Sequence, residues 1–510
     1  FEKKYNQEKI DKYIQSIEAE LEELDYNDPK DKRKIVSREQ KISNIKAGIF
    51  TTKKEQELIR PINLGSSVDL PALMYSEEGF HFEVIKNNES GKPSTDEETL
   101  TNLRLTVKKP DSPKAIFLDR LLELRGLEKM YKTYIEGWNE KVQDDDRLHG
   151  RFLIHGTTSG RLSSAEPNAQ QIPKTSVDPN IKLQLKAPKG TLYIASDFSQ
   201  AELRIMAHLS GDETYLNAFN SGQDPHLAIA ATKYHIPYEE ALKIYEDENH
   251  PEHKIWKVRR KQAKQIAFGL IYGIGAKLLA VKLSDPKSGI IVTPEEAQKE
   301  MDIFFGQHPK LKTFLKKQEK FLRKNGHLVS LFGRKRRLPQ IYSNDKGEEA
   351  YALRLALNFP CQSAASDMCL FGSILIYYLM RQGKLPSTKS VCLVHDANYQ
   401  ITKPENINIW SIYEMWQIYR NPLTKPYFGF QIDDVTMDME FVIGRSMAEE
   451  LPFIPGYDYK KMLEPDFSVE EYMEEHKKYK HIPISEYKKR FNKQMKQYEK
   501  DFERSHSMES

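Results

Sequence analysis

Two aspartates that lie far apart in the chain each follow a short apolar run. The stretch "LYIASDF" leads to Asp197, and the stretch "CLVHDANYQI" contains Asp396. Short apolar runs predict strands, and two such strands in one sheet would bring the carboxylates together. A divalent cation would offset their repulsion, and two Mg²⁺ ions there could clamp the reacting oxygens of a displacement at phosphorus. The alternative is that Asp396 is an ordinary loop residue.

A second pattern lies in "RRKQAKQIAFGLIYG", residues 259–273, where chemically useful side chains recur every four residues. On a helix, Arg260, Lys264, Phe268 and Tyr272 would form one stripe about 18 Å long. Its first half is cationic and its second half is aromatic. That order suits a nucleoside triphosphate, with phosphates on the cations and the base and sugar against the rings. The alternative is an amphipathic helix with surface cations and core aromatics.

The composition indicates a soluble, cytosol-like protein. Hydrophobic residues make up 39% and charged residues 30% of the 510 residues. No run approaches the ~20 apolar residues of a membrane span, and three cysteines form neither a disulfide framework nor a zinc spacing. Residues 253–284 hold eight Lys/Arg and no acid, and residues 310–337 hold eleven Lys/Arg and one acid. Such patches attract polyanions, although either one alone could be a solvated helix face.

The elements that would position these groups are mostly helices with a few strands. Residues 202–330 and 354–380 are predicted to be mainly helical, and a helix is expected to begin at Ala201 with Glu202 in its first turn. Strands are predicted at residues 191–198, 390–402 and 430–443. An apolar stripe predicts an amphipathic helix near the N-terminus, formed by Ile10, Ile14, Ile17, Leu21 and Leu24.

These motifs, taken in order, resemble family A DNA polymerases. "DFSQAELR", "RRKQAKQIAFGLIYG" and "LVHDANYQ" are similar to motifs A, B and C of that family. Further similar stretches are "TSGRLSSAEPNAQQIP" (158–173), "DPH" (224–226), "GHLVSLFGRKRRLP" (326–339) and "RLALNFPCQSAASD" (354–367). The resemblance extends from about residue 60 to residue 445 and is specific, because many motifs occur in the family's order.

The resemblance implies an α+β fold shaped like a right hand, with an antiparallel sheet in the palm. The implied regions are a thumb-like helical region with an insert (1–135), palm (136–203), fingers (204–345), palm again (346–451) and an extension of unassigned role (452–510). We expect the extension to form exposed helices or to be partly disordered. No exonuclease domain is expected in the chain.

The same resemblance implies which residues carry the reaction. The metal ligands would be Asp197, Asp396 and the carbonyl of Phe198, with two Mg²⁺ ions as cofactors. The nucleotide would contact Gln200, Glu202, His226, Arg260, Lys264, Phe268 and Tyr272. Lys264 would also protonate the leaving pyrophosphate, and Glu202 beside Tyr272 would exclude a ribose 2′-OH. The primer–template would contact Arg161, Asn168, Gln171, Arg354, Gln362 and His395.

Some residues depart from the family pattern. Ala397 stands where Glu commonly follows the second aspartate, and Gln171 stands where Asn is usual. Ala201 and Ala267 replace the usual Ile and Asn. Because successive residues of a strand point to opposite faces, residue 397 is expected to point away from the metals. An acid there would then be auxiliary, and its loss would affect rate or fidelity rather than the reaction itself.

The implied function is DNA-templated DNA synthesis, with primer–template DNA and dNTPs as partners. A processivity partner or a separate exonuclease segment is a further possible partner, and no membrane is expected. One alternative is a single-subunit RNA polymerase, against which Glu202 argues; another is a silent DNA-binding remnant, against which Asp197, Asp396 and Lys264 argue. The expected location is the cytoplasm of a bacterial or phage-infected cell, with an organelle as the alternative.

Overall fold

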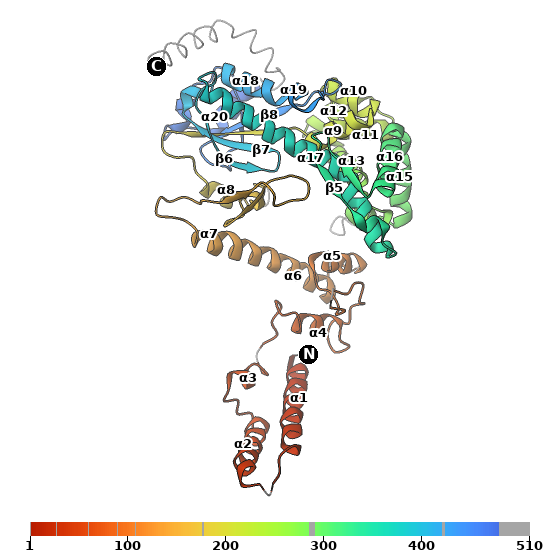
Figure 1. Cartoon of the computed structure of the whole chain (residues 1–510), viewed down its shortest axis with the longest axis vertical. Coiled ribbons are helices and arrows are strands. Elements are labelled where there is room, and N and C mark those ends of the chain that lie inside the picture. The colour runs from red at the N-terminus through yellow and green to blue at the C-terminus, as the bar shows by residue number, and fades with distance from the viewer. Residues whose placement is uncertain are drawn as a thin grey trace. The chain divides into compact units, whose positions relative to one another are not determined.

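The computed structural model describes residues 2–26, 28–59, 61–88, 90–107, 109–175, 178–284, 291–420 and 424–478. Within these residues the chain divides into two compact units. The first ends at Met130 and is drawn in red to orange in Figure 1. The second begins at Tyr131 and contains both predicted motifs with Asp197 and Asp396.

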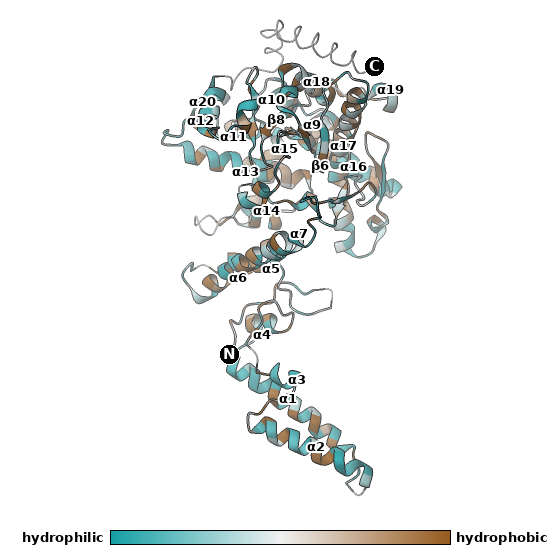
Figure 2. Ribbon diagram, turned by 90° about the vertical axis from the view of Figure 1, so that its left-hand side faces the viewer, coloured by the Kyte–Doolittle hydropathy of each residue, from teal (hydrophilic) through white to brown (hydrophobic). Residues whose placement is uncertain are grey.

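The first unit is helical. Its helices are α1 (Glu2–Glu22), α2 (Pro29–Lys46), α3 (Lys53–Gln56), α4 (Asp69–Tyr75), α5 (Glu97–Thr106) and α6 (Pro113–Met130). α1 and α2 lie side by side and bury Ile14, Ile17 and Ile45. The predicted apolar stripe is confirmed as far as Leu21, whereas Leu24 lies beyond the end of α1. The rest of both helices is mostly hydrophilic (Figure 2). A separate apolar core joins α4, α5 and α6 through Leu70, Leu100 and Leu118.

An antiparallel sheet of five strands is the centre of the second unit. Its order is β6 (Lys389–Val394), β7 (Ala397–Thr402), β3 (Leu192–Phe198), β8 (Met439–Gly444) and β9 (Leu451–Pro452). β3 lies in the middle and is buried at every residue except Asp197. A central strand covered on both faces reads as a nearly continuous apolar run, as "LYIASDF" does. The predicted strand at 191–198 is confirmed. Residues 390–402, predicted as one strand, form the two strands β6 and β7 with a turn at 395–396, and the strand predicted at 430–443 begins only at Met439.

Helices surround this sheet. They are α7 (Gly137–Asn139), α8 (Pro179–Gln184), α9 (Ala201–Ser210), α10 (Glu213–Asn220), α11 (Pro225–Lys233), α12 (Tyr238–Glu246), α13 (His253–Ile271), α14 (Ala276–Leu283), α15 (Pro294–Gln307), α16 (Pro309–Asn325), α17 (Lys346–Arg381), α18 (Ile409–Arg420), α19 (Lys425–Phe428) and α20 (Val469–Lys477). Two small ribbons pair β1 (Arg151–Leu153) with β2 (Ser163–Ala165) and β4 (His327–Val329) with β5 (Lys335–Arg337). The architecture is α+β, as predicted.

Helix α17 is the longest helix of the described chain. Within those residues it alone is long and apolar enough to cross a membrane by length and composition, and half of its most apolar window is buried. It packs against α9, α18 and β7, and it buries Phe359, Met368 and Ile376 (Figure 1). These contacts identify α17 as a core helix.

The segment after the sheet differs from its prediction. Tyr459 and Met462 lie in the short helix η6 (Tyr459–Leu463), Tyr472 lies in α20, and all three are buried in the main core. The Tyr472 hydroxyl also donates to the Pro452 carbonyl at 2.7 Å. The prediction of exposed helices or disorder is therefore wrong for residues 452–478, where widely spaced aromatics anchor the chain. Residues 479–510 lie outside the described residues.

Candidate active site

The register of the sheet brings the two predicted carboxylates together. Asp197, near the end of β3, pairs directly with Ala397, the first residue of β7. Asp396 lies one residue earlier, in the two-residue turn that joins β6 to β7, where His395 has a left-handed backbone (φ 56°). The structure therefore confirms that neighbouring strands of one sheet place Asp197 and Asp396 at the same end of the sheet.

The register also corrects the expectation for Ala397. Residues directly opposite each other in an antiparallel pair point to the same face. Ala397 is opposite Asp197 on one side and Glu440 is opposite it on the other, so all three side chains share a face. The prediction that residue 397 points away was wrong, because Asp396 lies in the turn and strand alternation does not relate the two residues.

The opposite face of the sheet secures this register. The Ser196 hydroxyl donates to the Asn398 carbonyl at 3.3 Å, and the Asn398 amide donates to the Tyr419 hydroxyl at 3.1 Å. The ring of Phe198 packs edge-on against Tyr419 with centroids 5.7 Å apart. These buried contacts resist a one-residue slip, which would move Asp197 to the other face.

The two carboxylates form no ion pair with any residue that the structure describes. The Asp197 side chain reaches solvent at the cavity, but the protein surrounding it removes much of its water. This burial, together with the neighbouring Asp396 and Glu440, raises the pKa of Asp197 to about 7. Burial also raises the pKa of Asp396. Neither carboxylate therefore has a cationic side chain paired with it.

This donor set fits a divalent cation. Within the described residues no three His, Cys, Asp or Glu side chains converge as a complete metal-binding group. Two carboxylates and the nearby Phe198 backbone offer hard oxygen ligands, which suit Mg²⁺ because that ion keeps several of its waters. Asp197 and Asp396 could therefore hold such an ion, with water completing its coordination.

A cavity of about 490 Å³ lies between Asp197 and helix α13, and Asp396 is not among its lining residues. Asp197, Phe198, Gln200 and Glu440 line it from the sheet side, and Arg260 lines it from α13. Cavities of this size accommodate small-molecule ligands. Its lining combines the acids Asp197 and Glu440 with Arg260, whose charge is paired with Asp224 in the same lining.

The predicted stripe on α13 is present in the expected order. Arg260 forms a two-point ion pair with Asp224, with Nη2–Oδ2 at 2.6 Å and Nε–Oδ1 at 3.1 Å. The Lys264 side chain is exposed, and its ammonium lies 5.8 Å from the centre of the Phe268 ring. Phe268 in turn stacks on Tyr272 at 6.1 Å. Both rings are partly exposed, which favours a binding stripe over a pair of core aromatics.

Glu202 connects three elements. The Tyr272 hydroxyl donates to its Oε2 at 2.5 Å, and Arg161 forms an ion pair with its Oε1. Burial and the nearby Glu202 carboxylate raise the pKa of Tyr272, so the phenol stays a donor. Glu202 is thereby fixed at the start of α9, shortly after Gln200, the residue before that helix, which has a left-handed backbone (φ 58°).

His226 is buried, and its nucleotide contact stays a prediction. It is 1% exposed, does not line the cavity, and has no hydrogen-bond partner for either ring nitrogen among the described residues. Burial lowers its pKa to about 4, so the imidazole is neutral. Its ring lies 5.8 Å from Phe268. In this structure His226 supports the aromatic half of the stripe and does not face the cavity.

The predicted DNA contacts lie on three segments. The Asn168 side chain accepts from the Gln170 amide at 3.0 Å, and the Gln170 side chain donates to the Leu393 carbonyl at 3.1 Å, which links this segment to β6. Gln171 is exposed beside them. Burial and the nearby Arg161 lower the pKa of His395, which places Arg161 close to the β6–β7 turn.

Arg354 and Gln362 lie on α17. A Cβ on Gly273 would come within 3.4 Å of Arg354 Cγ, and Gly273 has φ +67°, so glycine permits the end of α13 to approach α17. Arg354 is thereby adjacent to the Tyr272 end of the stripe. Gln362 is half-buried farther along the same helix.

Two functional candidates were missed from the sequence. Asp224 stands in the quoted "DPH" and holds Arg260, and Glu440 interrupts the apolar strand "MEFVIG". An acid within an otherwise apolar strand was the signal for Glu440. Nothing in the sequence indicated that Asp224 would be the partner of Arg260.

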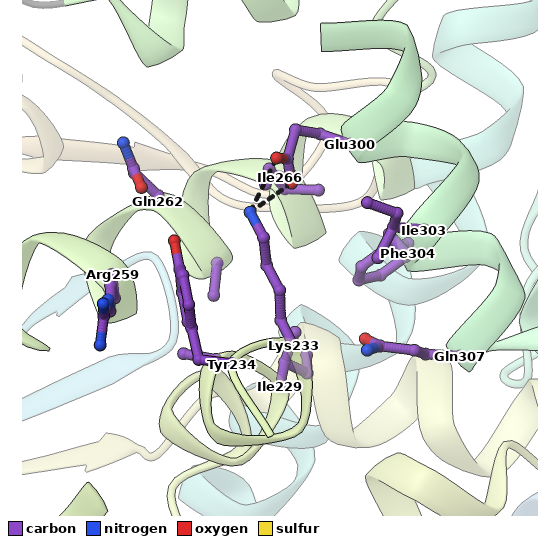
Figure 3. Close-up of a pocket in the computed structure, with 12 residues that line it drawn as sticks. Ile229, Lys233, Tyr234, Arg259, Gln262, Ile266, Glu300, Ile303, Phe304 and Gln307 are labelled. Atoms are coloured by element: carbon purple, nitrogen blue, oxygen red, sulfur yellow. Dashed lines mark hydrogen bonds and ion pairs between the residues drawn. The ribbon is translucent and has the colours of Figure 1, made fainter. Parts of the chain in front are cut away.

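The back of α13 adjoins a separate, smaller cavity of about 20 Å³ (Figure 3). Lys233 of α11 reaches Glu300 of α15 at 2.7 Å, and the Arg259 guanidinium lies 3.9 Å from the centre of the Tyr234 ring. A space of this size holds about one water. These contacts brace α13, and the cavity is too small to receive a nucleotide.

Comparison with known proteins agrees with this geometry. Residues 30–407 match the model of the family described as DNA polymerase family A. The chain belongs to that family. It is similar to the thermostable DNA polymerase I of Thermus aquaticus, with 32% identity over 319 residues, covering 62% of this chain and 35% of the relative. It is also similar to DNA polymerase I of Pseudomonas aeruginosa, with 32% identity over 336 residues, covering 66% of this chain and 33% of the relative.

A solved structure extends the family comparison to the fold. The POL domain of Pol1 from M. smegmatis, in complex with DNA primer-template and dNTP, matches with a TM-score of 0.62 and 29% identity. The match covers 77% of this chain and 62% of that one. The chain spans about a third of the length of the curated relatives it matches. Family A polymerases generally use divalent metal ions, which agrees with the donor set.

Proposed function

We propose that this chain is a DNA-templated DNA polymerase that adds deoxynucleotides to a primer 3′ end. The observation that carries the proposal is the cavity that Asp197 of β3 and Arg260 of α13 both line. Membership of family A supports it, as does the primer-template and dNTP in the similar M. smegmatis structure. Primer–template DNA and dNTPs are thus the proposed partners.

The chemistry joins the primer 3′ oxygen to the α-phosphorus, releases the hydroxyl proton to water and breaks the bond to the leaving pyrophosphate. Asp197, Asp396 and the Phe198 carbonyl would hold two Mg²⁺ ions. When bound, these ions would stabilise the charge on the attacking and leaving oxygens. Arg260 and Lys264 would bind the phosphates, and Lys264 would give a proton to the pyrophosphate.

The sugar and base would lie against Phe268 and Tyr272. Glu202, fixed by Tyr272 and Arg161, occupies the position that would exclude a ribose 2′-OH. A wall of fixed side chains discriminates by volume against an added hydroxyl. This arrangement favours dNTPs over NTPs and therefore a DNA polymerase over an RNA polymerase.

The remaining assignments are part of the same proposal. Arg161, Asn168, Gln171, Arg354, Gln362 and His395 would contact the primer–template. The first unit would act as the thumb, the sheet as the palm, and the helices between β3 and α17 as the fingers. The relatives named above are bacterial, which supports action on DNA in a bacterial cytoplasm.

The test is primer extension by the purified chain with a labelled primer, Mg²⁺ and either dNTPs or NTPs. Templated extension with dNTPs is expected, lost on chelation of the metal and in Asp197→Ala. Glu405→Ala, which removes an exposed acid elsewhere, is the matched control. Extension only with NTPs would indicate an RNA polymerase, and no extension with either would indicate a silent DNA-binding protein.

A further inference from the structure

Glu440 lies beside Asp197 and has no role in the reaction proposed above. Because β3 is central, Asp197 has a neighbour on each side, Ala397 on β7 and Glu440 on β8. Side chains directly opposite in such pairs have Cβ atoms roughly 5 Å apart. The position where the family commonly has Glu carries a methyl group here, and the strand on the other side carries an acid.

The Glu440 carboxylate is not engaged elsewhere. It forms no hydrogen bond or ion pair with the described residues, and it lines the same cavity as Asp197. The nearby cation Arg204 donates to the Ser199 and Thr436 carbonyls, and its guanidinium lies 4.3 Å from the centre of the Phe219 ring. Arg204 is therefore committed to other partners, and Glu440 faces the metal-binding edge without a directly paired counter-ion.

Its neighbour Asp438 also lines the cavity, and one of its two carboxylate oxygens is occupied. The Asp438 carboxylate accepts from the Trp416 indole at 3.2 Å and from the Met439 amide at 3.0 Å. These bonds hold Asp438 toward α18. Glu440 is thus the acid within β8 that lies directly opposite Asp197, and the described residues engage neither of its carboxylate oxygens.

We propose that Glu440 is a positioning residue that supplies the third carboxylate of the metal site, from the strand opposite Ala397. This inference rests on the proposed function. The described side chains do not converge as a three-acid ligand group, so Glu440 would act by its charge and by accepting from a metal-bound water. Residues 397 and 440 flank Asp197 on its two sides, so an acid at either position should strengthen metal binding.

The test measures Mn²⁺ affinity of the DNA-free chain by electron paramagnetic resonance, alongside the Mg²⁺ dependence of single-turnover extension. Glu440→Gln should weaken Mn²⁺ binding by roughly three- to tenfold and raise the half-saturating Mg²⁺ concentration similarly. Adding Ala397→Glu to that variant should restore affinity to within about twofold of the parent. Glu405→Gln, an exposed acid outside the cavity, is the control and should leave both values unchanged.

Two results would overturn the inference. The first is a Mn²⁺ affinity of Glu440→Gln that equals that of the parent. The second is a loss of affinity in Glu440→Gln that Ala397→Glu does not restore, because such a loss would indicate a structural role for Glu440. If Glu440→Gln does not fold, Ala397→Glu alone is decisive: it should tighten Mn²⁺ binding about threefold, and unchanged affinity contradicts the proposal. A parent that binds Mn²⁺ but extends no primer would refute only the proposed function.

Discussion

Asp197 and Asp396 are held by backbone pairing, whereas the side chains of the α13 stripe are held by side-chain partners. The register of β3, β7 and β8 fixes the carboxylate edge, and buried hydrogen bonds on the far face support it. Arg260 instead depends on Asp224, and Tyr272 on Glu202. The carboxylate end of the sheet therefore keeps its geometry without side-chain partners, whereas the proposed phosphate contact of Arg260 would compete with its ion pair to Asp224.

The largest expected effect comes from removing either of the two carboxylates that the sheet holds in place. Asp197→Ala and Asp396→Ala should each reduce single-turnover extension by at least about a thousandfold, because stabilisation of the reacting oxygens is lost. Primer–template affinity, measured by fluorescence anisotropy, should stay within a few fold of the parent. Extension above a few per cent of the parent rate in either variant would refute the assignment of the metal ligands.

Glu202→Ala tests the second region of the comparison, where side chains are held by side-chain partners. Removing the carboxylate opens the space beside Tyr272, so the ratio of kcat/KM for NTPs over dNTPs should rise by about a hundredfold. Steady-state incorporation of a single nucleotide measures both constants. An unchanged ratio would show that Glu202 does not discriminate between the sugars.

The metal-free chain offers a stability test of the carboxylate edge. The pKa of Asp197 is about 7 when folded, against an unfolded value of 3.8, so the folded state binds more protons between these values. Stability therefore falls as pH rises through this window. In EDTA, Asp197→Asn should be more stable than the parent by roughly 2 kcal/mol at pH 8, a figure reduced for solvent screening at the cavity, and similar to it at pH 4. Equal melting temperatures at pH 8 would contradict the raised pKa.

Asp224→Asn tests whether the Asp224 carboxylate competes with phosphate for Arg260. Asn can still cap α11 through the Leu227 amide, but it cannot form the ion pair. Arg260 would then be available to phosphate, so KM for dNTP should fall by up to about fivefold with kcat nearly unchanged. A rise in KM would mean that Asp224 orients Arg260 for binding and does not compete with the nucleotide.

The smallest expected effect is that of Ala397→Glu on rate. At saturating Mg²⁺ the added charge acts mainly on metal affinity, so kcat should change by less than about threefold. A Mg²⁺ titration of incorporation by parent and variant separates affinity from rate. A gain of a hundredfold or more would show that the parent site is impaired.

Much of this site could be predicted from sequence because its signals are local. Asp197 and Asp396 follow apolar runs, and the α13 stripe repeats every four residues, so each pattern contains its own evidence. The face of Ala397 and the role of Glu440 depend on which residues lie opposite in the sheet. That register is set by pairing between segments far apart in sequence, which no local pattern specifies.

Burial was hard to predict for the same reason. His226 belongs to a recognisable motif, yet whether its ring faces the cavity depends on Phe268 from another helix. The segment 452–478 looks polar in composition, but Tyr459 and Tyr472 find places in the core that only the folded sheet provides. In both cases tertiary packing determines which side chains are buried, and composition does not specify it.

The two-residue turn between β6 and β7 limits how this protein can vary in length. Its left-handed His395 satisfies a tight hairpin, and Asp396 sits within it. A single inserted or deleted residue in 395–402 would move Asp396 away from Asp197 and transfer the following side chains to the other face. In a library of variants, substitutions along β7 should therefore often survive selection for activity, whereas single-residue insertions and deletions there should be eliminated.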